Sequence, residues 1–216
     1  MELSNKEVMR YLGYRGVAAD DRTVSHITEL IDLFTLNVIP KNVYGIWDCQ
    51  IASSDVTLGG INVHSQNLAQ HLEGCRHAAL LAATLGPEAD TLIRRFSVQD
   101  MEKAVVAQAV CAAMIEAYCD EIESELARKP EFDGLHPTAR FSPGYGDFDI
   151  VHQKDILNIL NSGRIGLTLT DGYMLIPSKS VTAVIGFATE KCAATVVGMG
   201  KCERCADTQC TFRKAV

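Results

Sequence analysis

The longest predicted element of this chain is a helix from about Val98 to Arg128, which is unusually rich in alanine. Along it, Val106, Val110, Ala113 and Ala117 recur at helical spacing and form one apolar stripe. Because alanine side chains are small, a neighbouring element can pack close to such a stripe. We therefore expect one long helix that lies tightly against its neighbour.

Shorter segments on both sides of this helix carry the usual start and stop signals of helices and strands. Helices are predicted over residues 4–14, 20–39, 65–72 and 153–160, and also after Gly86-Pro87. A pair of strands is predicted over residues 43–63, around a turn at Gly59-Gly60, and a buried strand over residues 78–84. This pattern predicts an α/β or α+β domain, with a largely antiparallel sheet flanked by helices.

Composition argues against two classes of protein. The 216 residues carry a net charge of −7 and a pI near 5.3, without a Lys/Arg stripe that would suit nucleic acid. The longest apolar runs, such as Ala78 to Ala83, are far shorter than the ~20 residues of a membrane helix, and the N-terminus lacks a hydrophobic signal core. We expect a cytoplasmic protein with neither nucleic acid nor membrane as partner.

Residues 139–147, Ala-Arg-Phe-Ser-Pro-Gly-Tyr-Gly-Asp, combine a cation, a phenol and two glycines around a proline turn. Pro143 fixes φ, while Gly144 and Gly146 let the backbone approach a ligand closely. The guanidinium of Arg140 can hold a carboxylate through two parallel charge-assisted hydrogen bonds. Two interpretations remain open on the residues alone: a binding loop, or a surface turn with a solvated arginine.

Two further motifs follow this loop. Residues 165–171 read Ile-Gly-Leu-x-Leu-Thr-Asp, a predicted strand, and residues 174–183 read Met-x-x-Pro-x-Lys-Ser-Val-Thr-Ala, followed by apolar residues and Gly186. Together with Arg-x-Ser-Pro-Gly-Tyr-Gly-Asp at residues 140–147, this ordered block resembles the activation domain of cobalamin-dependent methionine synthase, most closely in its stand-alone form. None of the three motifs is a short generic pattern.

The resemblance implies a C-shaped domain that reactivates a cobalamin-dependent methyltransferase. In this family an outside carrier, such as a flavodoxin- or ferredoxin-like protein, supplies one electron to oxidised cobalamin, and S-adenosylmethionine supplies a methyl group. The cofactor performs the bond-making and bond-breaking steps, and the domain orients the reacting groups and places charges around them. The chain lacks Asp-x-His-x-x-Gly, the signature of cobalamin's lower histidine ligand. The resemblance therefore implies a methyltransferase component whose cobalamin is carried by a partner, a methionine synthase without its own activation domain.

The same resemblance implies roles for individual residues of the loop. Arg140 clamps the carboxylate of the methionine moiety, and the backbone around Ser142 and Gly144 lines the methionine or adenosine portion. Tyr145 stands near the methyl group that is transferred and is the catalytic candidate. Lys179-Ser180 either shape the same cleft or support the sheet.

Glu116 has two interpretations. It lies roughly 80° from the middle of the apolar stripe, at the edge of that face, where a glutamate head usually reaches water. Residues 115–118, Ile-Glu-Ala-Tyr, also resemble the family's Glu-Ala-aromatic helix segment, which implies a role in binding S-adenosylmethionine. A carboxylate has the right charge to face a sulfonium or an ammonium group.

The chain departs from full-length methionine synthases in two places. After the Pro-Gly-Tyr turn those proteins continue with Pro-x-Cys-Pro and an acidic-His segment, whereas residues 146–150 here are Gly-Asp-Phe-Asp-Ile. The resemblance therefore leaves the cobalamin-facing surface undefined. The first 60 residues also show no counterpart of the family's early aspartate ligand.

The eight cysteines fall into two groups. In a cytosolic chain, scattered cysteines with apolar neighbours are predicted to be small buried hydrophobes; these are Cys49, Cys75, Cys111 and Cys119. The others cluster late in the chain, in a predicted tail of residues 191–216 that follows a domain of residues 1–190; these are Cys192, Cys202, Cys205 and Cys210. Their spacing suits an iron–sulfur cluster or zinc, while redox-active thiols and unligated cysteines remain alternatives.

Three other functions stay open at the level of sequence. The client could be another corrinoid methyltransferase, which neighbouring genes would reveal. The chain could be a noncatalytic module that docks a corrinoid domain, which failure to bind S-adenosylmethionine would favour. It could also be a redox or metal sensor built on the cysteine tail, if metal alone governs partner binding.

Overall fold

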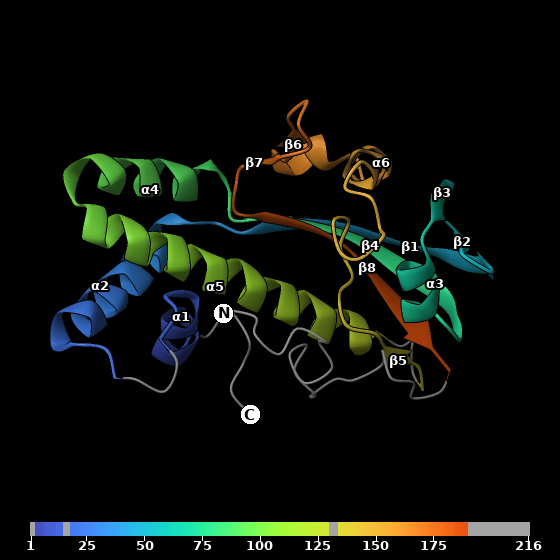
Figure 1. Cartoon of the computed structure of the whole chain (residues 1–216), viewed down its shortest axis with the longest axis horizontal. Helices are drawn as coiled ribbons and strands as arrows, with labels where there is room; N and C mark the ends of the chain where they lie inside the picture. The colour runs from blue at the N-terminus through green and yellow to red at the C-terminus, as the bar shows by residue number, and fades with distance from the viewer. Residues whose placement is uncertain (1–2, 15–17, 130–133, 190–216) are drawn as a thin grey trace.

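The computed structural model describes residues 3–14, 18–129 and 134–189 (Figure 1). The helices are α1 (Asn5–Tyr11), α2 (Asp21–Asn37), α3 (Gln66–His71), α4 (Pro87–Gln99), α5 (Met101–Ala127), α6 (His152–Ile159) and the 3-10 helix η2 (Ser162–Ile165). The strands are β1 (Lys41–Ala52), β2 (Asp55–Leu58), β3 (Ile61–His64), β4 (Cys75–Thr84), β5 (His136–Pro137), β6 (Thr168–Leu169), β7 (Leu175–Ile176) and β8 (Ser180–Ala188).

Six of these strands form one sheet in the order β3-β2-β1-β4-β8-β5, and β6 and β7 form a separate hairpin. Every pairing in the large sheet is antiparallel. This confirms the predicted class, an α/β arrangement with an antiparallel sheet flanked by helices. The strand β8, close to the C-terminal end of the described residues, lies between β4 and β5 and so belongs to the interior of the sheet.

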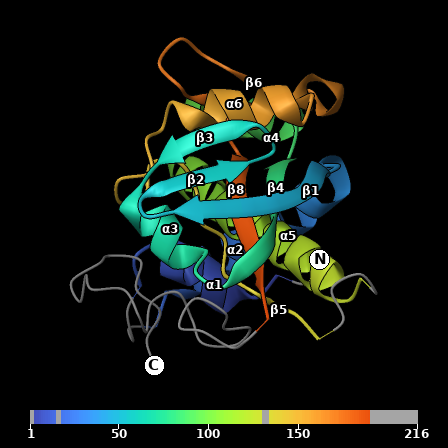
Figure 2. The same ribbon diagram turned by 90° about the vertical axis from the view of Figure 1, so that its right-hand side faces the viewer.

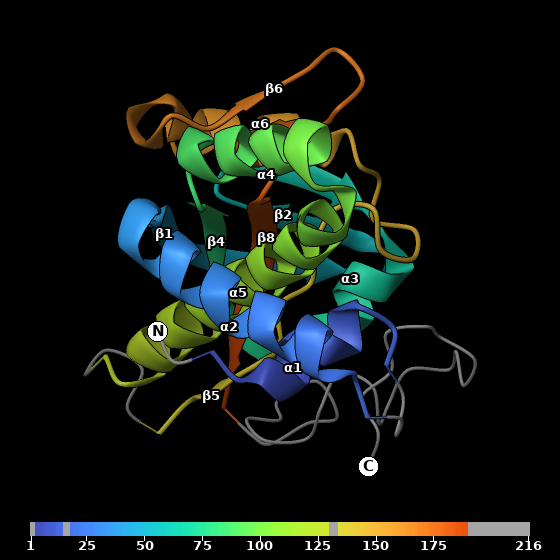
Figure 3. The ribbon, with the colours of Figure 1, turned by 90° about the vertical axis from the view of Figure 1, so that its left-hand side faces the viewer.

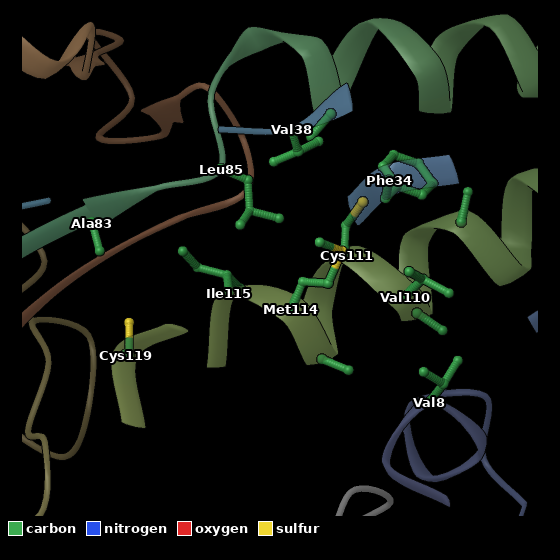
Figure 4. Packing of buried hydrophobic residues seen from close by; sticks show 14 of the residues in the cluster. Val8, Phe34, Val38, Ala83, Leu85, Val110, Cys111, Met114, Ile115 and Cys119 are labelled. Atoms are coloured by element: carbon green, nitrogen blue, oxygen red, sulfur yellow. The ribbon is translucent and has the colours of Figure 1, made fainter. Parts of the chain in front are cut away.

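The two faces of the sheet carry separate hydrophobic cores. On β4, Ala79, Leu81 and Ala83 face one core with α1, α2, α4 and α5, while the residues between them face a second core with α3 and α6. This alternation is expected, since successive side chains of a strand point to opposite faces. Figures 2 and 3 show the molecule from its two ends, and Figure 4 shows the packing of the first core around α5.

Helix α5 forms the centre of the first core. Its buried residues are not confined to the predicted stripe, because α5 is packed by the sheet on one side and by α1, α2 and α4 on others. The predicted start at Val98 is wrong. Val98 belongs to α4, and Asp100 separates the two helices and caps α5 by accepting a hydrogen bond from the Lys103 N–H at 3.1 Å.

Most local start signals are confirmed. The side chains of Ser4, Asp20 and Ser65 each accept an N–H bond at the first turn of a helix, and Pro87 begins α4.

Two strand predictions need correction. Residues 43–63 span three strands, because a further turn at Ser53, with φ of 58°, divides the first of the two predicted strands. Within residues 165–171 only Thr168–Leu169 form a strand, since the 3-10 helix ends at Ile165 and Gly166 adopts φ of 76°, which interrupts extension.

Candidate functional site

The segment that carries Arg140 is held along β8 by backbone hydrogen bonds. Phe141 and Val184 exchange two backbone hydrogen bonds of 2.9 and 2.8 Å. Further along, the Thr138 N–H donates to the Gly186 carbonyl at 2.9 Å, and the Gly186 N–H donates to Thr138 Oγ1 at 2.8 Å. A Cβ on Gly186 would lie 2.7 Å from Leu72 Cδ2 and 3.2 Å from Thr138 Cγ2. Gly186, which ends the third motif, therefore permits the segment that carries Arg140 to approach β8 closely.

Arg140 and Phe141 are consecutive residues that serve opposite faces of the sheet. Phe141 packs against the core formed with α3 and α6, with its ring centroid 4.9 Å from that of His71. The Arg140 side chain reaches α5 on the other face, as the alternation of an extended backbone requires. His71 Nε2 lies 2.7 Å from the Ala139 carbonyl oxygen and thus helps to hold this segment in place.

The Arg140 guanidinium ends among three carboxylates of α5. Its side chain is only 3% exposed, and its nitrogens lie 2.9 Å from Glu116, 2.8 Å from Asp120 and 2.8 Å from Glu123. Burial opposes the charged form of Arg140, but the three carboxylates outweigh it and raise its pKa further. The solvated surface turn, which the residues alone left open, is therefore wrong for this arginine.

The three acids share one face of α5 because they lie at positions i, i+4 and i+7 of the helix. Their exposure rises from Glu123 at 23% through Glu116 at 39% to Asp120 at 64%. The position of Glu116 at the edge of the apolar face is confirmed. Asp120 and Glu123 were missed by the sequence analysis, although their spacing from Glu116 was a usable signal.

Residues 142–148 form a compact loop. The Gly144 N–H donates to the Phe148 carbonyl at 2.7 Å, and the Tyr145 N–H donates to the Ser142 carbonyl at 3.1 Å. Gly144 and Gly146 adopt φ of 94° and 56°, a region that residues with a Cβ rarely enter. The glycines thus give this loop its shape.

Asp147 ties the loop to the first turn of α3. Its carboxylate accepts hydrogen bonds from Ser65 Oγ, from the Gln66 N–H at 2.8 Å and from the Asn67 N–H at 3.1 Å. In return, the Asp147 N–H donates to the Asn67 side-chain oxygen at 3.1 Å. The Ser65 hydroxyl is the main cause of a lowered pKa of Asp147, and the two backbone donors add to it.

Tyr145 projects from this loop and is 60% exposed. Its ring lies edge-on to Phe141, with centroids 6.2 Å apart. Partial desolvation raises the pKa of Tyr145, the negative charge of Glu116 raises it further, and the charge of Arg140 opposes this. The structure thus brings Glu116, Arg140 and Tyr145 into one electrostatic neighbourhood.

The charge of Glu116 also acts on a second tyrosine, which the sequence analysis missed. Tyr11 at the end of α1 has a raised pKa, first because of burial and then because of the charge of Glu116. Its ring is covered by the Arg10 guanidinium, 4.2 Å from the ring centroid. Because α1 packs against α5, the N-terminal helix contributes to the surroundings of Glu116.

Lys179 and Ser180 lie away from this cluster, at the opposite end of β8 from Gly186. Ser180 Oγ donates to the Pro177 carbonyl at 2.6 Å and lies 2.8 Å from the Thr84 hydroxyl, and Lys179 Nζ lies 3.4 Å from the Gln108 carbonyl on α5. These contacts favour the second of the two predicted roles, support of the sheet. Burial lowers the pKa of Lys179.

The early cysteines are buried or partly buried side chains. Cys75, Cys111 and Cys119 are buried, and Cys49 is intermediate. Burial raises the pKa of Cys49 to about 11 and that of Cys111 to about 12, so neither is a thiolate at neutral pH. The late cysteines, Cys192, Cys202, Cys205 and Cys210, lie outside the described residues, as does the whole predicted tail of residues 191–216. Within residues 3–14, 18–129 and 134–189, His, Cys, Asp and Glu residues form no group suited to a metal ion.

Comparison with known families shows which family the chain belongs to. The family model of the vitamin B12-dependent methionine synthase activation domain matches residues 62–210, which is more than half of the chain. The chain belongs to this family. The matched region of the activation domain includes the Glu116 face of α5, the Arg140 loop and all four late cysteines.

Solved structures agree on the fold of this activation domain. The crystal structure of the MetH reactivation domain bound to AdoHcy matches with a TM-score of 0.64 and 14% sequence identity, over 91% of this chain and 80% of that one. Among curated proteins, no sequence matches. In the described part of the activation domain, no helix has the length and apolar character needed to cross a membrane.

Proposed function

We propose that this activation domain binds S-adenosylmethionine at the cluster of Glu116, Arg140 and Tyr145 and presents its methyl group to cobalamin on a separate polypeptide. The client is a methionine synthase without an activation domain of its own, and the electron comes from a flavodoxin- or ferredoxin-like carrier. The partner's cobalamin, once reduced by that electron, would supply the electron pair that takes the methyl group, and the sulfur of S-adenosylmethionine would keep the electrons of the broken carbon–sulfur bond. The observation that carries the proposal is the 2.9 Å contact between Glu116 and Arg140, whose charges both act on the exposed phenol of Tyr145.

The charges of this cluster fit the amino-acid end of S-adenosylmethionine, which carries a carboxylate and an ammonium beside its sulfonium. Arg140 is the group for the carboxylate, because a planar guanidinium holds it through two parallel bonds. The carboxylate of Glu116 faces the positive ammonium or sulfonium of the ligand. The backbone of Ser142 and Gly144 lines the remainder of the ligand, since the glycine leaves the approach to the chain open.

The ligand carboxylate has to compete with the acids that already surround Arg140. Asp120 is the partner most easily replaced, because at 64% exposure it regains most of its hydration when it swings away. Glu123, which is 23% exposed, keeps the guanidinium oriented. Exchange of Asp120 for the ligand therefore leaves the buried side of the arginine paired throughout.

Tyr145 is the residue that we place next to the methyl group. The charge of Glu116 and partial desolvation keep its phenol protonated at neutral pH, so its role is to shape and orient the reacting groups. No side chain of the cluster has to move a proton for the transfer of a methyl group.

The direct test is calorimetric titration of the full chain with S-adenosylmethionine. Glu116→Gln and Arg140→Lys should weaken binding about ten-fold, the loss expected when one charge-assisted hydrogen bond is removed. Arg94→Lys, on the exposed surface of α4, serves as the matched control. If the parent does not bind, or if both variants bind like the control while remaining folded, the assignment fails and a noncatalytic docking module becomes the better description.

A further inference from the structure

The motif of residues 165–171 lies beside a groove that the proposed function does not use. A cavity of about 580 Å³ opens between α6, η2 and the β6–β7 hairpin, which projects at the top of Figure 1. Its volume lies within the range of ligand pockets. The lining residues come from one helix and the turn and hairpin that follow it: Lys154, Leu157, Asn158, Asn161, Ser162, Gly163, Leu167, Thr168, Leu169, Thr170, Asp171 and Tyr173.

The groove is formed by regular local structure. Lys154, Leu157, Asn158 and Asn161 are spaced at i, i+3, i+4 and i+7, so they lie along one face of α6 and its end. Opposite them lies the segment of residues 167–171. The buried hydroxyl of Ser162 holds the two sides together, since it lies 3.1 Å from the Leu157 carbonyl oxygen and 3.3 Å from the Leu167 carbonyl oxygen.

The lining combines an apolar floor with a polar but formally neutral rim. Leu157 and Leu167 are 7% and 1% exposed and form the floor. Lys154 and Asp171 contribute one charge of each sign, which leaves no net charge to select an anion or a cation. Around them stand groups that both donate and accept hydrogen bonds: the amides of Asn158 and Asn161 and the hydroxyls of Thr168 and Thr170.

The hairpin extends this surface with exposed apolar side chains. Thr168 pairs with Ile176 across the hairpin, so their side chains lie on the same face. Ile176 is 49% exposed and Met174 is 68% exposed. Large apolar groups that border a polar groove are typical of a contact surface.

We propose that this groove receives the edge of the corrin ring carried by the partner. The inference rests on the proposed function. A corrin is a flat apolar macrocycle fringed by neutral primary amides, and these are the complements of an apolar floor with neutral donors and acceptors. A nucleotide or phosphate ligand would call for more than the single cation Lys154.

The loop that carries Tyr145 is packed against the start of the helix that lines the groove. A Cβ on Gly144 would lie 3.1 Å from Ile150 Cδ1, just before α6, and the rings of Phe148 and His152 lie with their centroids 5.7 Å apart. On the other side, Gln153 Nε2 donates to the Tyr173 carbonyl at 3.1 Å and joins the helix to the hairpin. The loop that carries Tyr145 and the groove are thus held by the same helix.

Cobinamide, a corrin with its amide side chains but without the nucleotide, is a suitable probe. We expect saturable binding to the full chain, followed by equilibrium dialysis and visible absorption. Asn158→Leu should weaken this binding about five-fold, the value of one neutral hydrogen bond. Gly163→Phe should weaken it more, because Gly163 lines the groove and a Cβ there would meet no atom within 4 Å, which leaves a phenyl group free to enter the groove. Asn161 is a poor choice for substitution, since its φ is 49°.

The matched control is Gln108→Leu, which exchanges an exposed amide on α5 for leucine outside the groove. It should bind cobinamide like the parent. A soluble porphyrin without amides should bind more weakly than cobinamide, and equal binding would refute recognition of the amide fringe. Absence of saturable cobinamide binding, or variants that bind it like the parent, would overturn the proposal.

Titration with S-adenosylmethionine separates this proposal from the function on which it rests. Asn158→Leu and Gly163→Phe should bind S-adenosylmethionine like the parent, because neither residue belongs to the cluster around Arg140. If the chain binds S-adenosylmethionine but not cobinamide, only the proposal that the groove binds the corrin ring is refuted. A chain that binds cobinamide through the groove but not S-adenosylmethionine refutes the proposed function instead.

Discussion

Replacement of Arg140 by alanine should destabilise the whole domain in addition to weakening ligand binding. The guanidinium is the common partner of three carboxylates and is 3% exposed. Its removal leaves those acids facing one another along a single face of α5, where like charges at i and i+4 repel. The free energy of unfolding should therefore fall markedly.

The size of the effect follows from the exposure of the three acids. Glu123 is 23% exposed, so its pair with Arg140 resembles a buried ion pair, for which loss of one partner costs about 3–5 kcal/mol. The more exposed pairs with Glu116 and Asp120 contribute about 0–1 kcal/mol each. Because Glu123 keeps some contact with water, the lower end applies, and we expect a total loss of about 3–4 kcal/mol.

Urea unfolding followed by circular dichroism measures this loss directly. Arg140→Lys should recover part of the stability, since an ammonium can pair with one or two of the acids but lacks the planar fork. The control is Arg94→Ala, an exposed arginine on α4, which should change stability by no more than about 0.5 kcal/mol.

A double-mutant cycle identifies the partner that matters most. Glu123→Gln in the Arg140→Ala background should cost much less than in the parent, with a coupling energy above about 1 kcal/mol. The same cycle with Asp120→Asn should give a smaller coupling. If Arg140→Ala stays within about 0.5 kcal/mol of the parent, or if Glu123 and Arg140 show no coupling, the buried ion cluster does not stabilise the domain as argued.

Four further outcomes are expected. Tyr145→Phe should leave affinity for S-adenosylmethionine nearly unchanged and slow single-turnover methylation of the partner's cobalamin; an unchanged rate would remove Tyr145 from the reaction centre. Gly146→Ala should lower both stability and ligand affinity, because φ is 56° and the new Cβ would collide with the Asn67 side chain; calorimetry showing normal binding would contradict this. The pKa of Asp147 is lowered in the folded state, so its contribution to stability is present above the unfolded value of about 4 and is lost as pH falls; the acid dependence of the unfolding midpoint should be weaker in Asp147→Asn. Cys205→Ser should lose any iron–sulfur cluster or zinc held by the late cysteines, as seen by visible absorption or elemental analysis after anaerobic purification, and a metal-free parent would refute that prediction.

Features set by local chemistry were predictable from the sequence. The caps at Ser4, Asp20 and Ser65 depend on residues within one turn, and the positive φ values of Gly144 and Gly146 follow from the lack of a Cβ. The division between α4 and α5 was predicted but placed too early, at about Val98 instead of after Asp100. Apolar residues recur at helical spacing through that point, and the cap formed by Asp100 was the local signal that was missed.

The arrangement of the site depended on contacts that are distant in sequence. Arg140 meets Glu116 because the residues around Phe141 pair with β8, whose position between β4 and β5 no local pattern specifies. Charge pattern on α5 could have suggested a cation opposite Glu116, Asp120 and Glu123. It could not have selected Arg140 from the other basic residues, because that choice depends on the fold of the sheet.

The pairing of β1 with β4 has a consequence for how the family's boundaries are interpreted. Positions from Lys41 to Asp48 on β1 pair with β4, whereas the family match begins at residue 62, within β3. A fragment trimmed to the matched region would lack β1 and would expose one whole edge of β4. The alanines and leucines of β4 are buried on both faces of the sheet, and an exposed edge of such a strand favours self-association. The segment by which the family is detected is therefore smaller than the unit that folds, and expression at those limits should produce aggregates.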